Sequence, residues 1–223
     1  MKSTTHLYPQ IISVENLLIA WEEFIEGKSK RTDVQIFSQN LLQNVILLNH
    51  DLTDFTYKHG GYQQFQISDP KTRIIHKATV RDRLVHHAIY RILYPIFDKS
   101  FVYDSYSCRL EKGTHRAVKR LENFTRKVSR NYSNPCFVLK CDIKKFFASV
   151  DHKILLEIIK RKISDLDLLW LLDEIIGSFG LKFAVQLELF DFVRQNRERE
   201  RERERDTLRV RDSNWQFNQS AVC

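Results

Sequence analysis

No run in this 223-residue sequence approaches the roughly 18 apolar residues that a helix needs to cross a bilayer. The first apolar cluster, near Ile11, is interrupted by polar residues, so the N-terminus lacks the apolar segment of a signal peptide. Cysteine is also scarce, and Cys108, Cys136, Cys141 and Cys223 fall in no spacing typical of zinc ligands. A disulfide or zinc framework is therefore not indicated, and we expect a cytoplasmic protein in a reducing setting.

Positive charge is abundant but unevenly distributed. The net charge is +8, yet residues 57–162 alone carry 23 Lys and Arg against 9 Asp and Glu. The segments before and after this block each have a net charge of −3. A basic block between slightly acidic flanks is the electrostatic pattern of a protein that binds a polyanion. The alternative is an ordinary lysine-rich surface exposed to water.

Two helices are predicted before this block, and we interpret both as packing helices, with contact to RNA as the alternative. The first runs from Ser13, a suitable N-cap, to Glu26, with Gly27 where a C-terminal glycine belongs. The second is expected to run from about Val34 to about Asp54, since apolar residues recur there at helical spacing.

The basic block opens with a predicted β-hairpin over residues 57–75. Phe65 and Ile67 alternate with glutamines, and a turn sequence containing Lys71 precedes Arg73. Basic residues near such a tip can close over an anionic ligand, because lysine and arginine both bind phosphate oxygens. The alternative is a hairpin whose charges are merely solvated.

Two further helices are expected within the basic block. One begins at Val80 and continues through Phe97, and we interpret its adjacent His86 and His87 as packing or backbone-contact residues. The other begins with Thr114 as N-cap and runs to Val128. It has one apolar face for the core and one basic face, which suits the phosphates and 2′-hydroxyls of A-form RNA.

The stretch from Phe137 to His152 organises the rest of the sequence. Residues 137–141 read as a short buried strand that delivers Asp142 at its C-terminal end. Asp151 is placed to cap a following helix. A carboxylate at a strand end, among lysines and bulky aromatics, is a suitable Mg²⁺ ligand beside a nucleotide. The alternative is an exposed aspartate that only ends a strand.

This stretch resembles motif A of reverse transcriptases of the bacterial group II intron, retron and diversity-generating retroelement type. Those enzymes share an apolar strand, then Asp-Ile-Lys-x-Phe-Phe, then Asp-His before a helix, and residues 137–152 present every landmark in order. The Arg-Asp-Arg-Leu-Val-His-His-Ala run from Arg81 and the Ser-Tyr-x-x-Arg-x-x-x-Gly-x-His-x-Ala block from Ser105 are also typical of the family. The resemblance covers residues 13–180.

The resemblance implies an α+β, helix-rich fold with reverse-transcriptase fingers and an incomplete palm. It divides the chain into an N-terminal helical extension (1–56), a fingers region (57–135), a partial palm (136–180) and a divergent, disordered charged tail (181–223). The family activity is RNA-directed DNA synthesis, in which a DNA primer on an RNA template attacks a dNTP with the help of two Mg²⁺ ions.

The resemblance also implies roles for individual residues. Asp142 is the expected catalytic metal ligand, with the Ile143 carbonyl as a further ligand. Phe147 is expected to exclude a ribose 2′-hydroxyl from the nucleotide site. Three basic residues are expected to contact the phosphates of the nucleotide: Lys71, Arg73 and Arg109. Five are expected to contact the phosphates of nucleic acid: Arg81, Arg83, Arg116, Lys119 and Arg120.

Beyond Gly180 the family pattern stops, because the sequence has neither the expected Gly-x-Pro-x-Gly loop nor a Tyr-x-Asp-Asp turn. Residues 197–205 are instead a strict Arg-Glu alternation, which predicts that the chain leaves its ancestral reading frame shortly after Gly180. The alternative is a charged tail that binds RNA. We therefore expect this chain alone to be inactive as a polymerase. A non-catalytic RNA-binding remnant and a metal-dependent nuclease using Asp142 and Asp151 are the alternatives.

Overall fold

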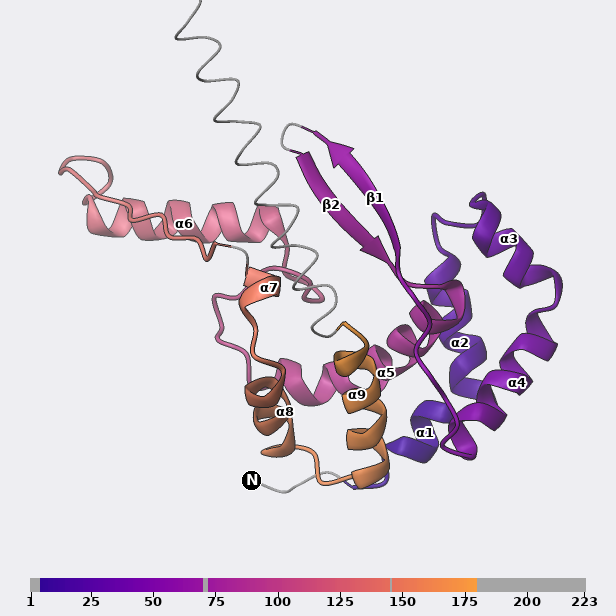
Figure 1. The fold of residues 1–223 in the computed structure, drawn as a ribbon. Coiled ribbons are helices and arrows are strands. Elements are labelled where there is room, and N and C mark those ends of the chain that lie inside the picture. Colours follow the sequence, from indigo (N-terminus) through magenta and orange to yellow (C-terminus); the bar gives the residue numbers. More distant parts are fainter. Residues whose placement is uncertain (1–4, 70–71, 145, 180–223) are drawn as a thin grey trace, which may run out of the picture. The chain divides into compact units, whose positions relative to one another are not determined.

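The computed structural model describes residues 5–69, 72–144 and 146–179. It is helix-rich with one two-stranded sheet, which confirms the expected α+β class (Figure 1). The elements are α1 (Tyr8–Ile12), α2 (Val14–Ile25), α3 (Thr32–Gln39), α4 (Leu41–Thr53), β1 (Gln63–Ser68), β2 (Thr72–Lys77), α5 (Val80–Asp98), α6 (Thr114–Val128), α7 (Phe146–Ser149), α8 (His152–Lys160) and α9 (Leu166–Ser178). The chain divides into two units at Ile175. No helix in the described ranges is long and apolar enough to span a membrane.

The first predicted helix is confirmed, whereas the second is wrong as a single element. In α2 the Ser13 hydroxyl accepts a hydrogen bond from the Asn16 N–H, and Gly27 follows the helix with a left-handed φ of +66°. The second helix breaks at Asn40 into α3 and α4. The Asn44 side chain donates to the Phe37 carbonyl at 2.9 Å, so the break leaves that carbonyl satisfied.

The apolar core is confined to the N-terminal half of the chain and to the residues around α9. Helix α2 packs against α1, α4 and α5, and α3 against α4 and α5. The most deeply buried apolar side chains are Ile11, Leu17, Ala20, Val45, Leu48, Leu52, Tyr57, Leu84, Val85, Ala88, Ile163, Leu168 and Leu171. Between Tyr90 and Lys162, by contrast, Ser129 is the sole buried residue among those whose burial is described. The described residues between Tyr90 and Lys162, which include the motif at 137–152, therefore form no core of their own.

Asp165 ties α9 to the N-terminus. Its carboxyl accepts hydrogen bonds from the backbone N–H groups of Leu7 at 2.7 Å and Tyr8 at 2.9 Å, and from that of Leu168 at 3.1 Å. One side chain thus caps α1 and α9 together. Burial raises the pKa of the Asp165 carboxyl, but these N–H donors outweigh burial and hold the pKa below its ordinary value.

The predicted hairpin is confirmed. β1 and β2 pair antiparallel, in a register that runs from Gln63 opposite Lys77 to Ser68 opposite Thr72 (Figure 1). Lys71, at the expected tip, lies outside the described residues.

Two further expectations are wrong, one about residues 137–141 and one about the start of α6. Residues 137–141 form no strand, and they are exposed rather than buried, with Phe137 95% and Leu139 87% exposed. A strand needs a neighbour for its N–H and C=O groups, and in the described part of the chain β1 and β2 pair only with each other. The N-cap of α6 is Gly113 and not Thr114, because glycine adopts the φ of +103° found there without strain.

Candidate nucleic-acid interface

Helix α6 presents both of its faces to solvent. On the apolar face Val118, Leu121, Phe124 and Val128 are 43–66% exposed, so the predicted burial of this face is wrong for the described chain. Other parts of the described chain do not cover this face, although its residues have the spacing of a packed helix.

The cations of α6 fall into two groups. Arg120 forms an ion pair with Asp104 at 2.9 Å, and Arg126 forms one with Glu122 at 2.6 Å. Arg116, Lys119 and Lys127 are exposed and have no ion pair with another described residue. These three are therefore the cations of this helix most available to a phosphate.

Exposed aromatic rings lie beside these cations. The Lys112 ammonium lies 3.9 Å from the centre of the Tyr103 ring, which is 69% exposed. The Arg120 guanidinium lies 4.4 Å from the Phe124 ring and 5.4 Å from the Tyr103 ring. Cations interleaved with exposed aromatics are typical of surfaces that bind single-stranded nucleic acid, where rings stack on bases.

Arg109 is occupied within its own loop. Its guanidinium donates to the Asp98 carboxyl at 2.7 Å and to the carbonyls of Val102 at 3.0 Å and Ser105 at 3.3 Å. These contacts hold together the loop between α5 and α6. The expected phosphate contact of Arg109 stays a prediction, and it requires the guanidinium to leave some of these partners.

Arg81 and Arg83 are likewise paired inside the protein. Arg81 binds Asp51 at 2.5 Å and lies over the Tyr57 ring. Arg83 binds Asp33 at 2.5 Å, and Asp33 also binds Lys77 at 2.7 Å. Burial raises the pKa of the Asp33 carboxyl, but the two cations outweigh it and keep the pKa below its ordinary value. These pairs connect the N-terminus of α5 to α3, α4 and β2, so any contact with nucleic acid competes with them.

The base of the hairpin is fixed by Asp82, which sequence reasoning did not single out. Its fully buried carboxyl accepts hydrogen bonds from the Tyr57 hydroxyl at 2.8 Å, the Thr79 hydroxyl at 2.6 Å and the Gly60 N–H at 3.1 Å. Tyr57 and Gly60 precede β1, and Thr79 follows β2. One carboxyl therefore joins both ends of the hairpin to α5.

We call Asp82 and its three hydrogen-bond donors the Asp82 hub, and two histidines lie beside it. The Nε2 atoms of His59 and His86 are 3.2 Å apart, and the rings stack with their centres 5.2 Å apart. The backbone N–H of His59 donates to the Glu174 carboxyl of α9 at 3.2 Å. His86 is therefore a packing residue, as expected. His87 instead contacts Glu23 at 3.1 Å.

The site residues expected in the motif at 137–152 are exposed to solvent. Asp142 is exposed, the Ile143 side chain is 63% exposed, and Phe147 is 85% exposed. Asp151 accepts hydrogen bonds from the N–H groups of Lys153 at 2.8 Å and Ile154 at 3.1 Å, which confirms it as the cap of α8. Arg73 of β2 is also exposed.

Comparison with known proteins supports a distant relationship. The chain is 24% identical over 171 residues to the group II intron-encoded protein LtrA of Lactococcus lactis subsp. cremoris. The aligned residues make up 73% of this chain and 27% of LtrA. It is 28% identical over 106 residues to protein YkfC of Escherichia coli (strain K12), which covers 46% of this chain and 27% of YkfC. No protein-family model matches the chain.

The aligned part of this chain thus spans about a quarter of the length of each relative. The relationship to a group II intron-encoded protein agrees with the resemblance inferred from residues 137–152. The narrower retron and diversity-generating retroelement types, and the individual site roles, stay predictions.

The described residues offer ligands for at most one Mg²⁺ ion. Among them, no three His, Cys, Asp or Glu side chains gather where a metal ion could bind. Asp142 and the Ile143 carbonyl fit an ion whose other ligands are water and substrate phosphates. Chemistry with two ions requires further carboxylates around them.

Proposed function

We propose that this chain is the fingers and first palm segment of a reverse-transcriptase-like protein, and that residues 57–162 bind RNA or an RNA–DNA hybrid. The observation that carries the proposal is the stretch from Phe137 to His152, which reproduces a family motif in order. The distant similarity to a group II intron-encoded protein supports it over most of the chain. The basic block supplies the charge that a phosphate backbone requires.

In this proposal Asp142 supplies one carboxylate to Mg²⁺, and the ion would stabilise the oxygens of a phosphoryl transfer. Phe147 lines the sugar of the incoming nucleotide, and Arg73 with Lys71 contacts its phosphates. The single motif carboxylate makes nucleic-acid binding without catalysis the second candidate function. A nuclease using Asp142 and Asp151 is not favoured, because the Asp151 carboxyl caps α8.

Neutralising two of the three unpaired cations of α6 is expected to weaken RNA binding. For Arg116→Gln with Lys119→Gln we expect a roughly tenfold or greater loss of affinity at about 0.1 M salt, because each lost phosphate contact retains counterions on the RNA. The measurement is fluorescence anisotropy with a labelled RNA hairpin. The control, Arg126→Gln, removes a charge from the same helix at a position that already has an acidic partner, Glu122. An equal loss per charge removed would show that only net charge matters.

Primer extension is expected to be absent from this 223-residue chain, because the sequence holds no Tyr-x-Asp-Asp turn to accompany Asp142. A DNA primer annealed to an RNA template, incubated with dNTPs and Mg²⁺ or Mn²⁺, should stay unextended. Extension that Asp142→Ala abolishes and Asp151→Ser preserves would contradict this expectation. Serine is chosen at 151 because it keeps the helix cap.

A further inference from the structure

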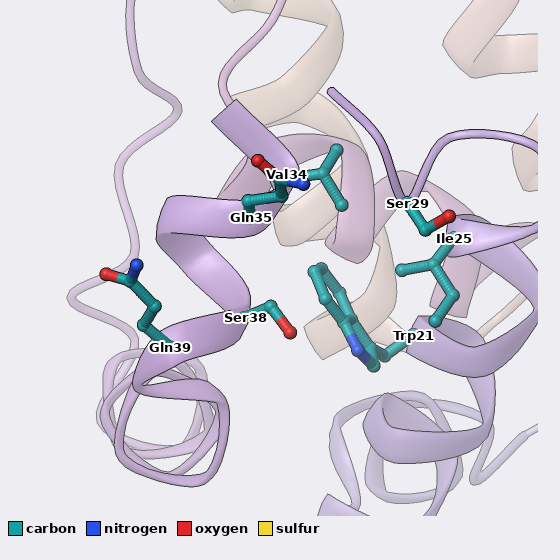
Figure 2. Close-up of a pocket in the computed structure, with 7 residues that line it drawn as sticks. All are labelled: Trp21, Ile25, Ser29, Val34, Gln35, Ser38 and Gln39. Carbon is teal, nitrogen blue, oxygen red and sulfur yellow. The ribbon is translucent and has the colours of Figure 1, made fainter. Parts of the chain in front are cut away.

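A pocket of about 320 Å³ lies between α2 and α3. Trp21, Ile25 and Val34 form its apolar floor, and its rim is made by Ser29, Gln35, Ser38 and Gln39 (Figure 2). The Trp21 ring is held in place by Phe24 and Phe37, whose ring centres lie 5.8 and 5.1 Å from it. The pocket shares no residue with the basic block.

The rim has unused hydrogen-bonding capacity. The side chains of Gln35, Ser38 and Gln39 lie three and four residues apart on α3, so they share one face of the helix. None of them, nor the Ser29 hydroxyl, hydrogen-bonds to another side chain or backbone group within the described ranges. Figure 2 shows Ser38 beside the indole and the Gln39 amide at the outer edge. Each amide offers both a donor and an acceptor.

The lining selects for an uncharged, flat ligand with hydrogen-bonding edges. No charged side chain lines the pocket, so a carboxylate or ammonium group inside it would lack a partner. A nucleobase satisfies these conditions, because glutamine amides and serine hydroxyls pair with base edges and apolar side chains contact the ring. The volume is sufficient for one base and lies within the range of small-molecule sites.

Charge near the pocket is consistent with a phosphate outside it. Lys30 and Arg31 follow the pocket residue Ser29 in the turn before α3, and both are exposed without an ion pair to another described residue. Glu22 of α2 and Glu26, which follows α2 as its C-cap residue, are exposed, so an anion is favoured only on the Lys30 and Arg31 side.

We propose that the pocket between α2 and α3 binds an unpaired nucleobase, with Gln35, Ser38 and Gln39 contacting the base edge and Lys30 and Arg31 contacting its phosphate. The site is separate from the nucleic-acid surface of the proposed function. It would give the N-terminal helices base recognition that backbone contacts alone cannot supply.

The test compares a ten-nucleotide single-stranded RNA with an abasic strand of the same length and charge. The readout is the ratio of the two affinities, which cancels the contribution of the basic block. We expect the base-bearing strand to bind at least tenfold more tightly, and Gln35→Ala with Gln39→Ala to reduce this ratio severalfold. Gln43→Ala, on the exposed face of α4, is the matched control and should leave the ratio unchanged.

A second variant, Ser38→Phe, fills the pocket without removing charge and should also reduce the ratio. Unfolding midpoints of all variants establish that each is folded.

A separate experiment titrates the protein with each of the four nucleoside monophosphates. Saturable binding that Ser38→Phe abolishes would identify a free nucleotide as the occupant. A ratio near one for the wild type, or a ratio that neither pocket variant changes, would overturn the proposal. The affinity ratio is also measured in a protein that carries Arg116→Gln and Lys119→Gln. The base-bearing strand should still bind more tightly than the abasic strand there, because the pocket does not depend on the α6 surface.

Discussion

Asp82→Ala is expected to lower the free energy of unfolding by about 3 kcal/mol, because it leaves the buried Tyr57 hydroxyl without an acceptor and frees two further donors. The measurement is chemical denaturation followed by circular dichroism. Asp82→Asn keeps the size of the side chain but replaces one acceptor oxygen by a donor, so an intermediate loss is expected. Amide hydrogen exchange in β1 and β2 should accelerate in both variants, since the hub joins both ends of the hairpin to α5.

Gly60 and Gly61 provide a matched test of the same hub. A Cβ at Gly60 would lie 2.8 Å from an Asp82 carboxyl oxygen and 3.0 Å from the Thr79 methyl group, whereas a Cβ at Gly61 meets nothing within 4 Å. We expect Gly60→Ala to cost about 1–3 kcal/mol and Gly61→Ala less than about 0.5 kcal/mol. An equal loss of unfolding free energy at the two glycines, or no loss for Asp82→Ala, would contradict the stabilising role of Asp82.

Stability is expected to fall as the pH falls from about 6.5 to about 4, because of His86. Burial, with the neighbouring His59 as a smaller cause, lowers the pKa of His86 to about 4 despite the opposing charge of Asp82. The unfolded chain binds a proton at about pH 6.5, so between these two values it binds more protons than the folded chain. The loss attributable to His86 has an upper limit of about 3 kcal/mol and is complete near pH 4.

The pH effect is measured from denaturation curves at several pH values for wild type and His86→Asn. The wild-type free energy of unfolding should decline more steeply over this range than that of the variant. His76→Gln is the comparison, because burial also lowers the pKa of His76, and it should remove only a smaller part of the slope. Parallel curves for wild type and His86→Asn would show that His86 titrates normally in the folded protein.

Local signals in the sequence predicted helices better than they predicted the strand before Asp142. Ser13 and Asp151 cap α2 and α8 as expected, because capping depends on residues within one turn. Residues 137–141 have the composition of a strand, yet a strand also depends on a partner elsewhere in the chain. The break at Asn40 was missed because the apolar spacing continues across it.

The hubs of the fold could not be predicted, since each depends on contacts between distant residues. Asp33, Asp82 and Asp165 look like ordinary polar residues in the sequence, and their partners lie up to 158 residues away. The same limit applies to Arg81, Arg83 and Arg109, for which the resemblance implied phosphate contacts. In the structure, all three arginines have acidic partners within the protein.

The salt dependence of RNA binding tests the central claim most directly. Affinity for an RNA–DNA hybrid, measured from about 50 to 300 mM salt, should fall with a slope of magnitude about 3 or more in a double-logarithmic plot. Arg116→Gln with Lys119→Gln should reduce that slope by about two. A slope below about one, or no binding at the lowest salt concentration, would contradict a nucleic-acid-binding role for residues 57–162.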